Sequence, residues 1–241
     1  MMIDLTGKTA VVFGGNGDVG NNLIQKLFLH KIDYVYTSFH TNYNNILELK
    51  KNHSDKLSFY QVDVRDYIAV EKFVENIQRI DIGINCVGIV EDHSVSNLQL
   101  ESWNNVIETN LTGTFNTSKS LFKKMKSAKQ GKIINISSII GIQGAFGQSN
   151  YAASKSGILG LTKTLAIEGA KYNILVNCVV PGYVKSNMTK NIPQHILNNI
   201  IQKIPLQKLG TLDDISNAIL FLSSDYSRYI TGETINITGG L

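Results

Sequence analysis

Lys8-Thr-Ala-Val-Val-Phe13 leads without a break into Gly14-Gly-Asn-Gly-Asp-Val-Gly20, so a short apolar run is followed by a glycine-rich turn. A helical pattern comes next, and its buried side carries Leu23, Ile24, Leu27 and Phe28. Glycines allow a tight turn and let the backbone approach a pyrophosphate, which then meets the positive end of the helix. The order of strand, Gly15-x-Gly17-x-x-Gly20 and helix therefore predicts a dinucleotide-binding unit, although such a turn can exist without a ligand.

Short apolar runs alternate with longer helical patterns along the rest of the chain. The predicted strands are Thr9–Phe13, Tyr34–Ser38, Leu57–Val62, Ile80–Asn85, Lys132–Ser137, Ile174–Val179 and Thr234–Thr238. The predicted helices lie near 19–30, 66–78, 101–126, 150–170 and 212–223. This alternation predicts an α/β fold: one doubly wound, Rossmann-type domain over 1–241, with a seven-stranded, mostly parallel sheet and helices on both faces. Ligands of such sheets bind beyond the carboxyl ends of the strands.

The composition is ordinary for a globular protein. The 241 residues are 43% hydrophobic and 17% charged, with a net charge of +4. This mild, scattered charge does not favour nucleic acid, and no apolar run reaches membrane-spanning length. We see no signal peptide before the first strand, and Cys86 and Cys178 have no metal-ligand spacing. We therefore expect a cytoplasmic protein with buried, reduced thiols, no metal site, and no membrane or nucleic-acid partner.

A phenol and an amine stand four residues apart in Tyr151-Ala-Ala-Ser-Lys155. On a helix this spacing places both on one face. A tyrosine has a pKa of about 10, and a nearby ammonium lowers that value by favouring the phenolate. The pair is suited to exchanging a proton with an alcohol or carbonyl oxygen. The spacing alone is weak, because a packed tyrosine beside a solvated lysine is commoner.

Two loops after predicted strands add candidates. Asp63 follows the third strand, where its carboxylate could accept from an adenine amino group or could cap the helix that begins beyond Asp66. Asn85-Cys-Val-Gly88 closes the fourth strand, either beside a cofactor or as an ordinary turn.

Taken together, these segments resemble the classical short-chain dehydrogenase/reductase family over essentially the whole chain. Gly14–Gly20 is similar to the family's Thr-Gly-x-x-x-Gly-x-Gly loop, and Asn85–Gly88 resembles its Asn-Asn-Ala-Gly. The remaining matches are to the helix asparagine, the catalytic serine, the Tyr-x-x-x-Lys pair and the motif after the sixth strand: Asn110, Ser138, Tyr151 with Lys155, and Pro181-Gly182. Within the family, the stretches 103–111, 147–155 and 229–234 are most similar to 3-oxoacyl-[acyl-carrier-protein] reductases.

The resemblance implies four catalytic residues. Tyr151 would protonate the developing alkoxide, and Ser138 would donate a hydrogen bond to the same oxygen. Lys155 would lower the pKa of Tyr151 and hold the nicotinamide ribose, and Asn110 would anchor a water that relays protons to Lys155. The implied cofactor-binding residues are Gly14, Asn16, Gly17, Asp18, Val19, Gly20, Ser38, Asp63, Val64, Asn85, Val87, Gly88, Tyr151, Lys155, Pro181, Gly182, Val184 and Ser186.

The chain departs from the family pattern at four positions. Phe13 replaces the threonine before the loop, and Cys86 and Val87 replace the usual Asn and Ala. Asp18 replaces the middle glycine, where a carboxylate should repel a pyrophosphate unless it turns away or pairs with a cation.

The end of the second strand favours NADPH over NADH. Enzymes that use NAD usually hold the ribose with an acid there, and Tyr36-Thr-Ser-Phe-His-Thr41 contains none. Ser38, His40 and Thr41 could bind a phosphate, but the stretch contains no arginine to clamp it.

The sequence-based hypothesis is an NAD(P)H-dependent carbonyl reductase that acts on a 3-oxoacyl thioester, bound to acyl carrier protein or CoA, in fatty acid or polyketide-like synthesis. Two alternatives stay open: a dehydrogenase of another alcohol, sugar or cyclic ketone, and a catalytically silent dinucleotide-binding sensor or scaffold.

The resemblance further implies a homotetramer and a substrate lid near 183–209. That lid offers Met188 and other apolar residues to an acyl chain: Ile196, Leu197, Ile200 and Ile201. An acidic carrier protein would dock on basic residues near the active-site mouth, for which Lys129, Lys132 and Lys171 are the candidates.

Overall fold

The computed structural model describes residues 3–41, 44–190 and 192–241, apart from the side chain of Met188. Within these residues, seven strands form one sheet: β1 (Thr9–Phe13), β2 (Tyr34–Phe39), β3 (Leu57–Gln61), β4 (Ile82–Asn85), β5 (Gly131–Ile136), β6 (Ile174–Pro181) and β7 (Thr234–Ile237). Their order is β3-β2-β1-β4-β5-β6-β7, and every described pairing is parallel. The predicted Rossmann-type fold is confirmed. The strand order reverses between β1 and β4, which is where ligands of such sheets bind.

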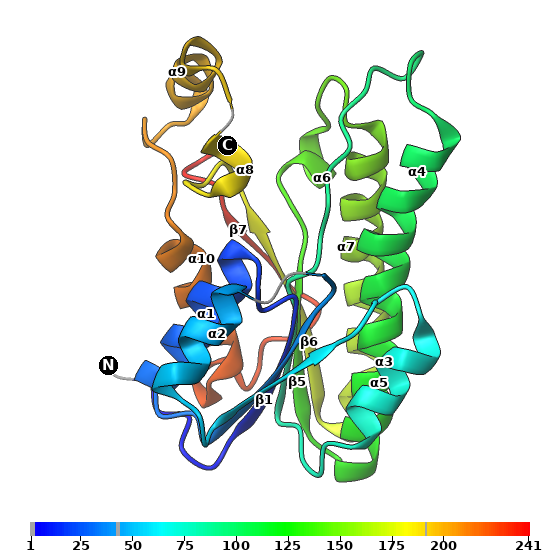
Figure 1. Cartoon of the computed structure of the whole chain (residues 1–241), viewed down its shortest axis with the longest axis vertical. Helices are drawn as coiled ribbons and strands as arrows, with labels where there is room; N and C mark the ends of the chain where they lie inside the picture. Colours follow the sequence, from blue (N-terminus) through cyan, green and yellow to red (C-terminus); the bar gives the residue numbers. More distant parts are fainter. Residues whose placement is uncertain (1–2, 42–43, 191) are drawn as a thin grey trace.

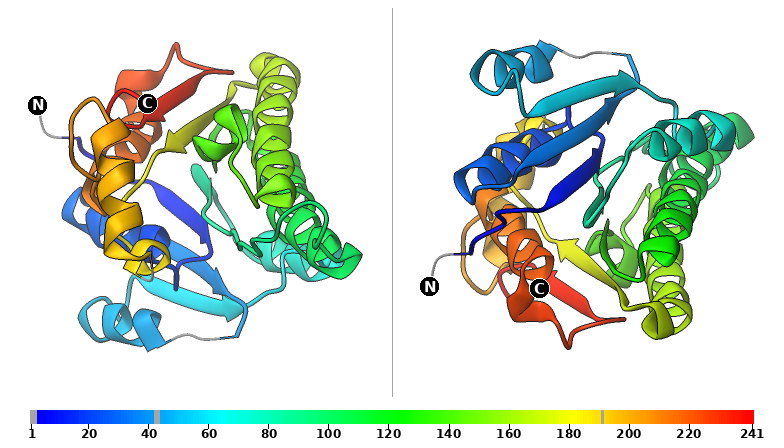
Figure 2. Two further views of the ribbon diagram at one scale, coloured as in Figure 1. Left: turned by 90° about the horizontal axis from the view of Figure 1, so that it is seen from above. Right: turned by 90° about the horizontal axis from the view of Figure 1, so that it is seen from below.

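Helices cover both faces of the sheet (Figures 1 and 2). On one side, α1 (Asp18–Leu29) packs against α10 (Leu212–Ser223), and α2 (Asn44–Asn52) lies beside α1 and β3. The other side carries α3 (Tyr67–Glu75), α4 (Leu100–Val106), α5 (Gly113–Ala128) and α7 (Ser149–Gly169). Three further helices lie beyond the carboxyl ends of the strands: α6 (Ile140–Gln143), α8 (Asn187–Lys190) and α9 (Gln194–Lys203). No described helix is both long and apolar enough to cross a bilayer.

Alternating side chains of β1 pack into two separate hydrophobic cores, one on each face of the sheet. Ala10 and Val12 point to one face and pack in the core that α1 and α10 cover. Val11 and Phe13 point to the opposite face and pack in the core that α3 and α5 cover. Each strand of a buried parallel sheet needs apolar side chains on both faces, because side chains alternate along it. This explains the continuous apolar run before the glycine loop.

Several helical segments differ from the prediction: α2, α6, α8 and α9 were not among the predicted helices, and one predicted helix is divided. Helix α2 was not predicted, because only Ile46 and Leu49 of its nine residues are buried and most of the others are polar. The helix predicted near 101–126 is three pieces: α4, a π-helical turn over Ile107–Thr112, and α5. Wide turns of this kind often occur at functional sites, and this one contains Asn110.

Candidate active site

The glycine loop is braced by β2. Gly14 has a φ of +81°, a backbone conformation that residues with a side chain rarely adopt. Its N–H donates to Ser38 Oγ at 3.3 Å. A Cβ on Gly20 would lie 2.4 Å from the Gly14 carbonyl oxygen. Helix α1 begins at Asp18, and its N-cap residue Gly17 provides no side-chain cap, so the N–H groups of the first turn face the crevice. Ser38 is 1% exposed and also lines the first cavity, so its predicted contact with a cofactor phosphate stays a prediction.

A crevice of two cavities lies beyond the carboxyl ends of the strands. The first, of about 400 Å³, contains eight of the predicted cofactor residues: Gly14, Asn16, Gly17, Ser38, Asp63, Val64, Val87 and Gly88. The second, of about 200 Å³, contains Gly17, Asp18, Val19, Val87, Gly88, Pro181, Gly182, Val184 and Ser186 together with Ser138, Tyr151 and Lys155. Gly17, Cys86, Val87 and Gly88 border both cavities, so one extended ligand could occupy them together.

Three predicted site residues line neither cavity: Gly20, Asn85 and Asn110. Asn85 is 3% exposed, and its Nδ2 donates to Ser118 Oγ at 2.9 Å and to Asn135 Oδ1 at 2.7 Å. Asn135 in turn donates to Thr162 Oγ1 at 2.9 Å. Asn85 therefore ties β4 and β5 to α5 and α7 beneath the crevice, and such buried networks fix one packing arrangement.

Tyr151 and Ser138 meet at the second cavity. Ser138 follows β5 and is 9% exposed, and Tyr151 lies in the first turns of α7. Burial raises the pKa of Tyr151, and a hydrogen bond with the Ser138 hydroxyl partly opposes that rise. The phenol is therefore protonated at neutral pH. Lys155 was expected to lower the pKa of Tyr151. It does not do so here, because its Nζ lies 5.7 Å from the centre of the tyrosine ring.

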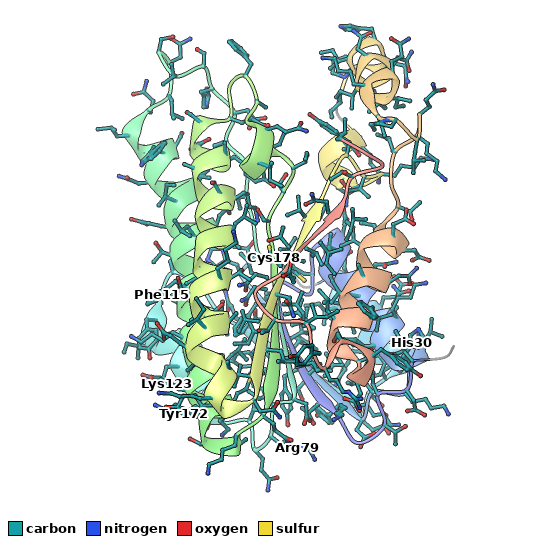
Figure 3. All side chains as sticks on the ribbon, turned by 180° about the vertical axis from the view of Figure 1, so that it is seen from behind. His30, Arg79, Phe115, Lys123, Tyr172 and Cys178 are labelled. Atoms are coloured by element: carbon teal, nitrogen blue, oxygen red, sulfur yellow. The ribbon has the colours of Figure 1, made fainter. Side chains whose placement is uncertain are left out.

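Lys155 is a buried ammonium group. It is 4% exposed, and its Nζ donates to the Ile136 carbonyl oxygen at 3.0 Å. Burial lowers its pKa to about 8, although the nearby Cys178 and Cys86 act in the opposite direction. Figure 3 shows Cys178 at the centre of the molecule. A Cβ on Gly88 would lie 3.2 Å from Nζ, so the glycine leaves room for the amine at the border of the two cavities.

Asn110 supports the loop that follows β4. Its Oδ1 accepts from the Ile89 N–H at 2.8 Å, and its Nδ2 donates to the Ile89 carbonyl oxygen at 3.0 Å. Its Nδ2 also lies 3.2 Å from Ser154 Oγ. Because the side chain is used in this way, Asn110 acts on the site by holding the cavity wall near Gly88. Its suggested link to a proton-relay water stays a prediction.

Asp63 lines the first cavity in an ion pair. It accepts from Arg65 Nη2 at 2.7 Å and lies 3.5 Å from His40 Nε2, and hydrogen bonding to Arg65 lowers its pKa. It is not a helix cap: Asp66 caps α3 by accepting from the Ile68 and Ala69 N–H groups. Arg65 also corrects the expectation that this end of the crevice lacks an arginine, which sequence reasoning missed because Arg65 follows β3 rather than β2.

The family departures are accommodated locally. Phe13 is fully buried and packs edge-on against Phe73, with ring centres 5.6 Å apart, so it belongs to the core and does not line the crevice. The Asp18 carboxylate accepts from the Asn187 N–H at 2.5 Å and from Asn187 Nδ2 at 2.6 Å. It pairs with an amide rather than with a cation. Cys86 and Val87 form the shared border of the two cavities.

The predicted lid region contains α8 and α9. Its base is fixed where Val184 bridges to Gly210, and α9 has no buried residue along its length. Ile196 is 43% exposed and Leu206 is 64% exposed. The side chain of Met188, expected to face substrate, lies outside the described part of the structure.

The three lysines expected near the mouth lie elsewhere in the single chain. Lys129 ends α5, Lys132 is at the start of β5, and Lys171 lies between α7 and β6. These are the amino ends of the strands, opposite the crevice, so their expected position near the mouth of the same chain is wrong. The Lys132 Nζ also donates to the Ser224 carbonyl oxygen and is not free for docking.

The residues present fit a nicotinamide dinucleotide. An uncapped helix N-terminus faces the junction of the two cavities, which suits a pyrophosphate. The first cavity offers the paired Asp63, Arg65 and His40 to an adenosine. The second places the hydroxyls of Ser138 and Tyr151 and the Lys155 ammonium together, which suits a nicotinamide ribose beside a carbonyl group.

Known proteins resemble this chain over nearly its full length. A family model described as "Enoyl-(Acyl carrier protein) reductase" matches residues 20–241. A 3-oxoacyl-[acyl-carrier-protein] reductase of Buchnera aphidicola is 39% identical over 238 residues, which cover 97% of each chain. Another, of Rickettsia conorii, is 37% identical over 240 residues, which cover 100% of this chain and 99% of its own. An acetoacetyl-CoA reductase of Acinetobacter is 36% identical over 245 residues, covering 97% of each chain.

The fold and crevice define a dinucleotide-dependent oxidoreductase with a tyrosine, a serine and a lysine in one cavity. The chain belongs to the short-chain dehydrogenase/reductase family, and its cofactor is a nicotinamide dinucleotide.

Proposed function

We propose that this enzyme reduces a 3-oxoacyl thioester to the 3-hydroxyacyl form with NADPH, in fatty acid or polyketide-like synthesis. The observation that carries the proposal is the second cavity, where two hydroxyls and a buried ammonium border the dinucleotide crevice. The relatives named above, which are reductases of 3-oxoacyl and acetoacetyl thioesters, support the choice of substrate.

Ser138 and Tyr151 stabilise the charge that develops on the substrate oxygen. When bound in the crevice, the cofactor would supply a hydride to the carbonyl carbon. The Ser138 hydroxyl donates a hydrogen bond to the carbonyl oxygen, and the Tyr151 phenol transfers its proton to the same oxygen. The phenol begins protonated because burial raises its pKa. Lys155 borders the same cavity, where its ammonium group suits the ribose of the nicotinamide.

A substrate panel tests this proposal against its alternatives. NADPH oxidation is followed with an acetoacetyl thioester, with cyclic ketones and with sugars, and NADP reduction is followed with the matching alcohols. We expect the highest kcat/KM for the thioester. A higher value for a cyclic ketone or an alcohol would assign another substrate, and dinucleotide binding without turnover of any of them would favour a sensor or scaffold.

The crevice supports NADPH rather than NADH. The region after β2 has no acid, and His40 and Thr41 line the first cavity with Arg65. Asp63 is the acid within reach, and its negative charge is already offset by Arg65 and His40. We expect kcat/KM to be at least about tenfold higher with NADPH, since a 2′-phosphate gains charge-assisted hydrogen bonds. A preference for NADH would contradict this choice.

We also propose that an acyl carrier protein delivers the substrate to the lid. The segment 183–209 contains Lys185, Lys190, Lys203 and Lys208 but no Asp or Glu, so the lid beside the crevice is basic. Carrier proteins are acidic, and such docking is sensitive to salt.

The docking surface can be located by charge reversal at both ends of the molecule. Lys203→Glu with Lys208→Glu should raise KM several-fold for the carrier-bound substrate and leave KM for acetoacetyl-CoA unchanged. Lys129→Glu with Lys171→Glu is the comparison pair at the opposite end. If only the comparison pair raises KM, the carrier docks at the end opposite the crevice and the lid proposal is wrong.

Two properties of the assembly complete the proposal. Exposed Phe115 on α5 and Ile167 on α7, which are 44% and 79% exposed, support a homotetramer that uses these helices as one interface. Figure 3 shows Phe115 at the outer side of this layer. The free Cys86 and Cys178 support a cytoplasmic location, where thiols stay reduced.

A further inference from the structure

The cofactor loop and the lid are joined by a pair of hydrogen bonds. Asp18, the first residue of α1, accepts from both the backbone N–H and the side-chain Nδ2 of Asn187, the first residue of α8. The two residues lie 169 positions apart in the sequence. Among the described residues, these are the hydrogen bonds that connect α8 to the glycine loop.

Asn187 is held in the orientation that this contact requires. Its Oδ1 accepts from Lys190 Nζ at 2.8 Å, which leaves Nδ2 directed to the Asp18 carboxylate. The same turn is closed by Thr189, whose Oγ1 accepts from the Ser186 N–H at 3.0 Å and donates to the Val184 carbonyl oxygen at 2.8 Å. The donors are therefore preorganised for the carboxylate.

The contact lies at the wall of the second cavity. Asp18 and Ser186 both line that cavity, one from the glycine loop and one from the base of the lid. Beyond α8, helix α9 has no buried residue that would hold it in place by packing. A hydrogen-bonded carboxylate at this point can therefore determine how firmly the lid rests on the crevice.

We propose that Asp18 and Asn187 form a latch that holds α8 against the glycine loop and slows release of the dinucleotide. Asp18 is thus a positioning residue that acts through the lid. The latch rests on the contacts between Asp18 and Asn187 alone, whereas its effect on release also rests on the proposed use of NADPH.

Hydrogen exchange of the ligand-free chain tests the latch directly. Asp18→Asn removes the negative charge, and Asn187→Asp places two carboxylates together, so each should speed exchange at residues 186–190 by about three- to tenfold. The double variant Asp18→Asn with Asn187→Asp restores a carboxylate–amide pair in reverse and should return exchange to within about twofold of wild type. Asp213→Asn is the control, because it breaks a different α1 contact, with Lys26 at 2.7 Å.

The rate of NADPH dissociation, followed by cofactor fluorescence, gives the second readout. Both single variants should release NADPH faster by a similar factor, and the reversed pair should regain the slow rate. Unchanged exchange in both single variants would overturn the latch, and faster exchange with unchanged release would overturn its effect on release. Tighter NADPH binding by Asp18→Asn with unchanged exchange would show simple charge repulsion instead. Exchange requires no substrate, so this result is independent of the thioester assay.

Discussion

Tyr151 and Lys155 line the same cavity, yet burial shifts their pKa values in opposite directions. It raises the pKa of the phenol and lowers the pKa of the amine to about 8, because each neutral form is favoured away from water. The phenol is thus a proton donor at neutral pH, and the ammonium is a charge that the fold carries at a cost in free energy.

The cost of burying Lys155 should be visible as a pH dependence of stability. The pKa is about 8 in the folded chain and 10.5 in the unfolded chain. Between these values the unfolded chain binds more protons, so stability rises with pH. Lys155→Met removes this titration, and its stability advantage over wild type should fall by about 3 kcal/mol between pH 8 and 10.5. Denaturant unfolding at several pH values measures it, and a constant difference would contradict a buried ammonium.

At the residue level, the sequence predicts which side chains share a face when they are close together on one helix. Tyr151 and Lys155 are one helical turn apart, so their shared face is predictable. The partners of Asp18 and Asp63 are not. Asn187 comes near Asp18 through the fold alone, and Arg65 enters the first cavity from the loop after β3. Asn187 and Arg65 each form hydrogen bonds to a carboxylate, and the sequence analysis did not predict these contacts.

At the level of elements, the β1–loop–α1 unit depends on close backbone contact. Its glycines bring the start of α1 against the end of β1, which exposes the helix N-terminus to the crevice. The sequence predicted this unit because its glycines and apolar run are adjacent. The sequence did not predict the π-helical turn that contains Asn110, since the apolar period continues through that turn.

Gly20→Ala should damage this unit. The added Cβ would lie 2.4 Å from the Gly14 carbonyl oxygen and 2.8 Å from the Gly15 Cα, both of which are backbone atoms that cannot move cheaply. We expect a loss of about 1–3 kcal/mol in the free energy of unfolding, together with weaker dinucleotide binding. Calorimetry of both properties measures the effect. Gln25→Ala, on the exposed side of α1, is the control and should change neither, and an unaffected Gly20→Ala variant would contradict the close contact.

In the whole molecule, the candidate functional site and the purely structural contacts lie at opposite ends of the sheet. The predicted catalytic and dinucleotide-binding residues lie beyond the carboxyl ends of the strands, while the amino ends carry structural contacts such as that of Lys132 with Ser224. Strand and helix alternation made this division predictable. The proposed tetramer interface comes from the family resemblance instead, because exposed apolar residues such as Phe115 and Ile167 follow no local pattern that differs from the core.

Ile167→Glu should weaken the proposed tetramer. A carboxylate at this exposed position of α7 would be buried against a second copy, which costs several kcal/mol if unpaired. Light scattering should show a tetramer for wild type and smaller species for the variant. Leu29→Glu, at a 73% exposed position on α1, is the matched control and should stay tetrameric. A tetrameric Ile167→Glu variant would place the interface elsewhere.

The central claim is that Tyr151 protonates the carbonyl oxygen of a 3-oxoacyl thioester. The most direct measurement is the rate of NADPH oxidation with an acetoacetyl thioester for wild type and Tyr151→Phe, with NADPH affinity measured on the same samples. We predict that the variant keeps its fold and binds NADPH but loses turnover by about a hundredfold or more, since only the proton donor is missing. Tyr229→Phe, at a fully exposed position, should retain the wild-type rate. A Tyr151→Phe variant with near wild-type turnover would contradict the account.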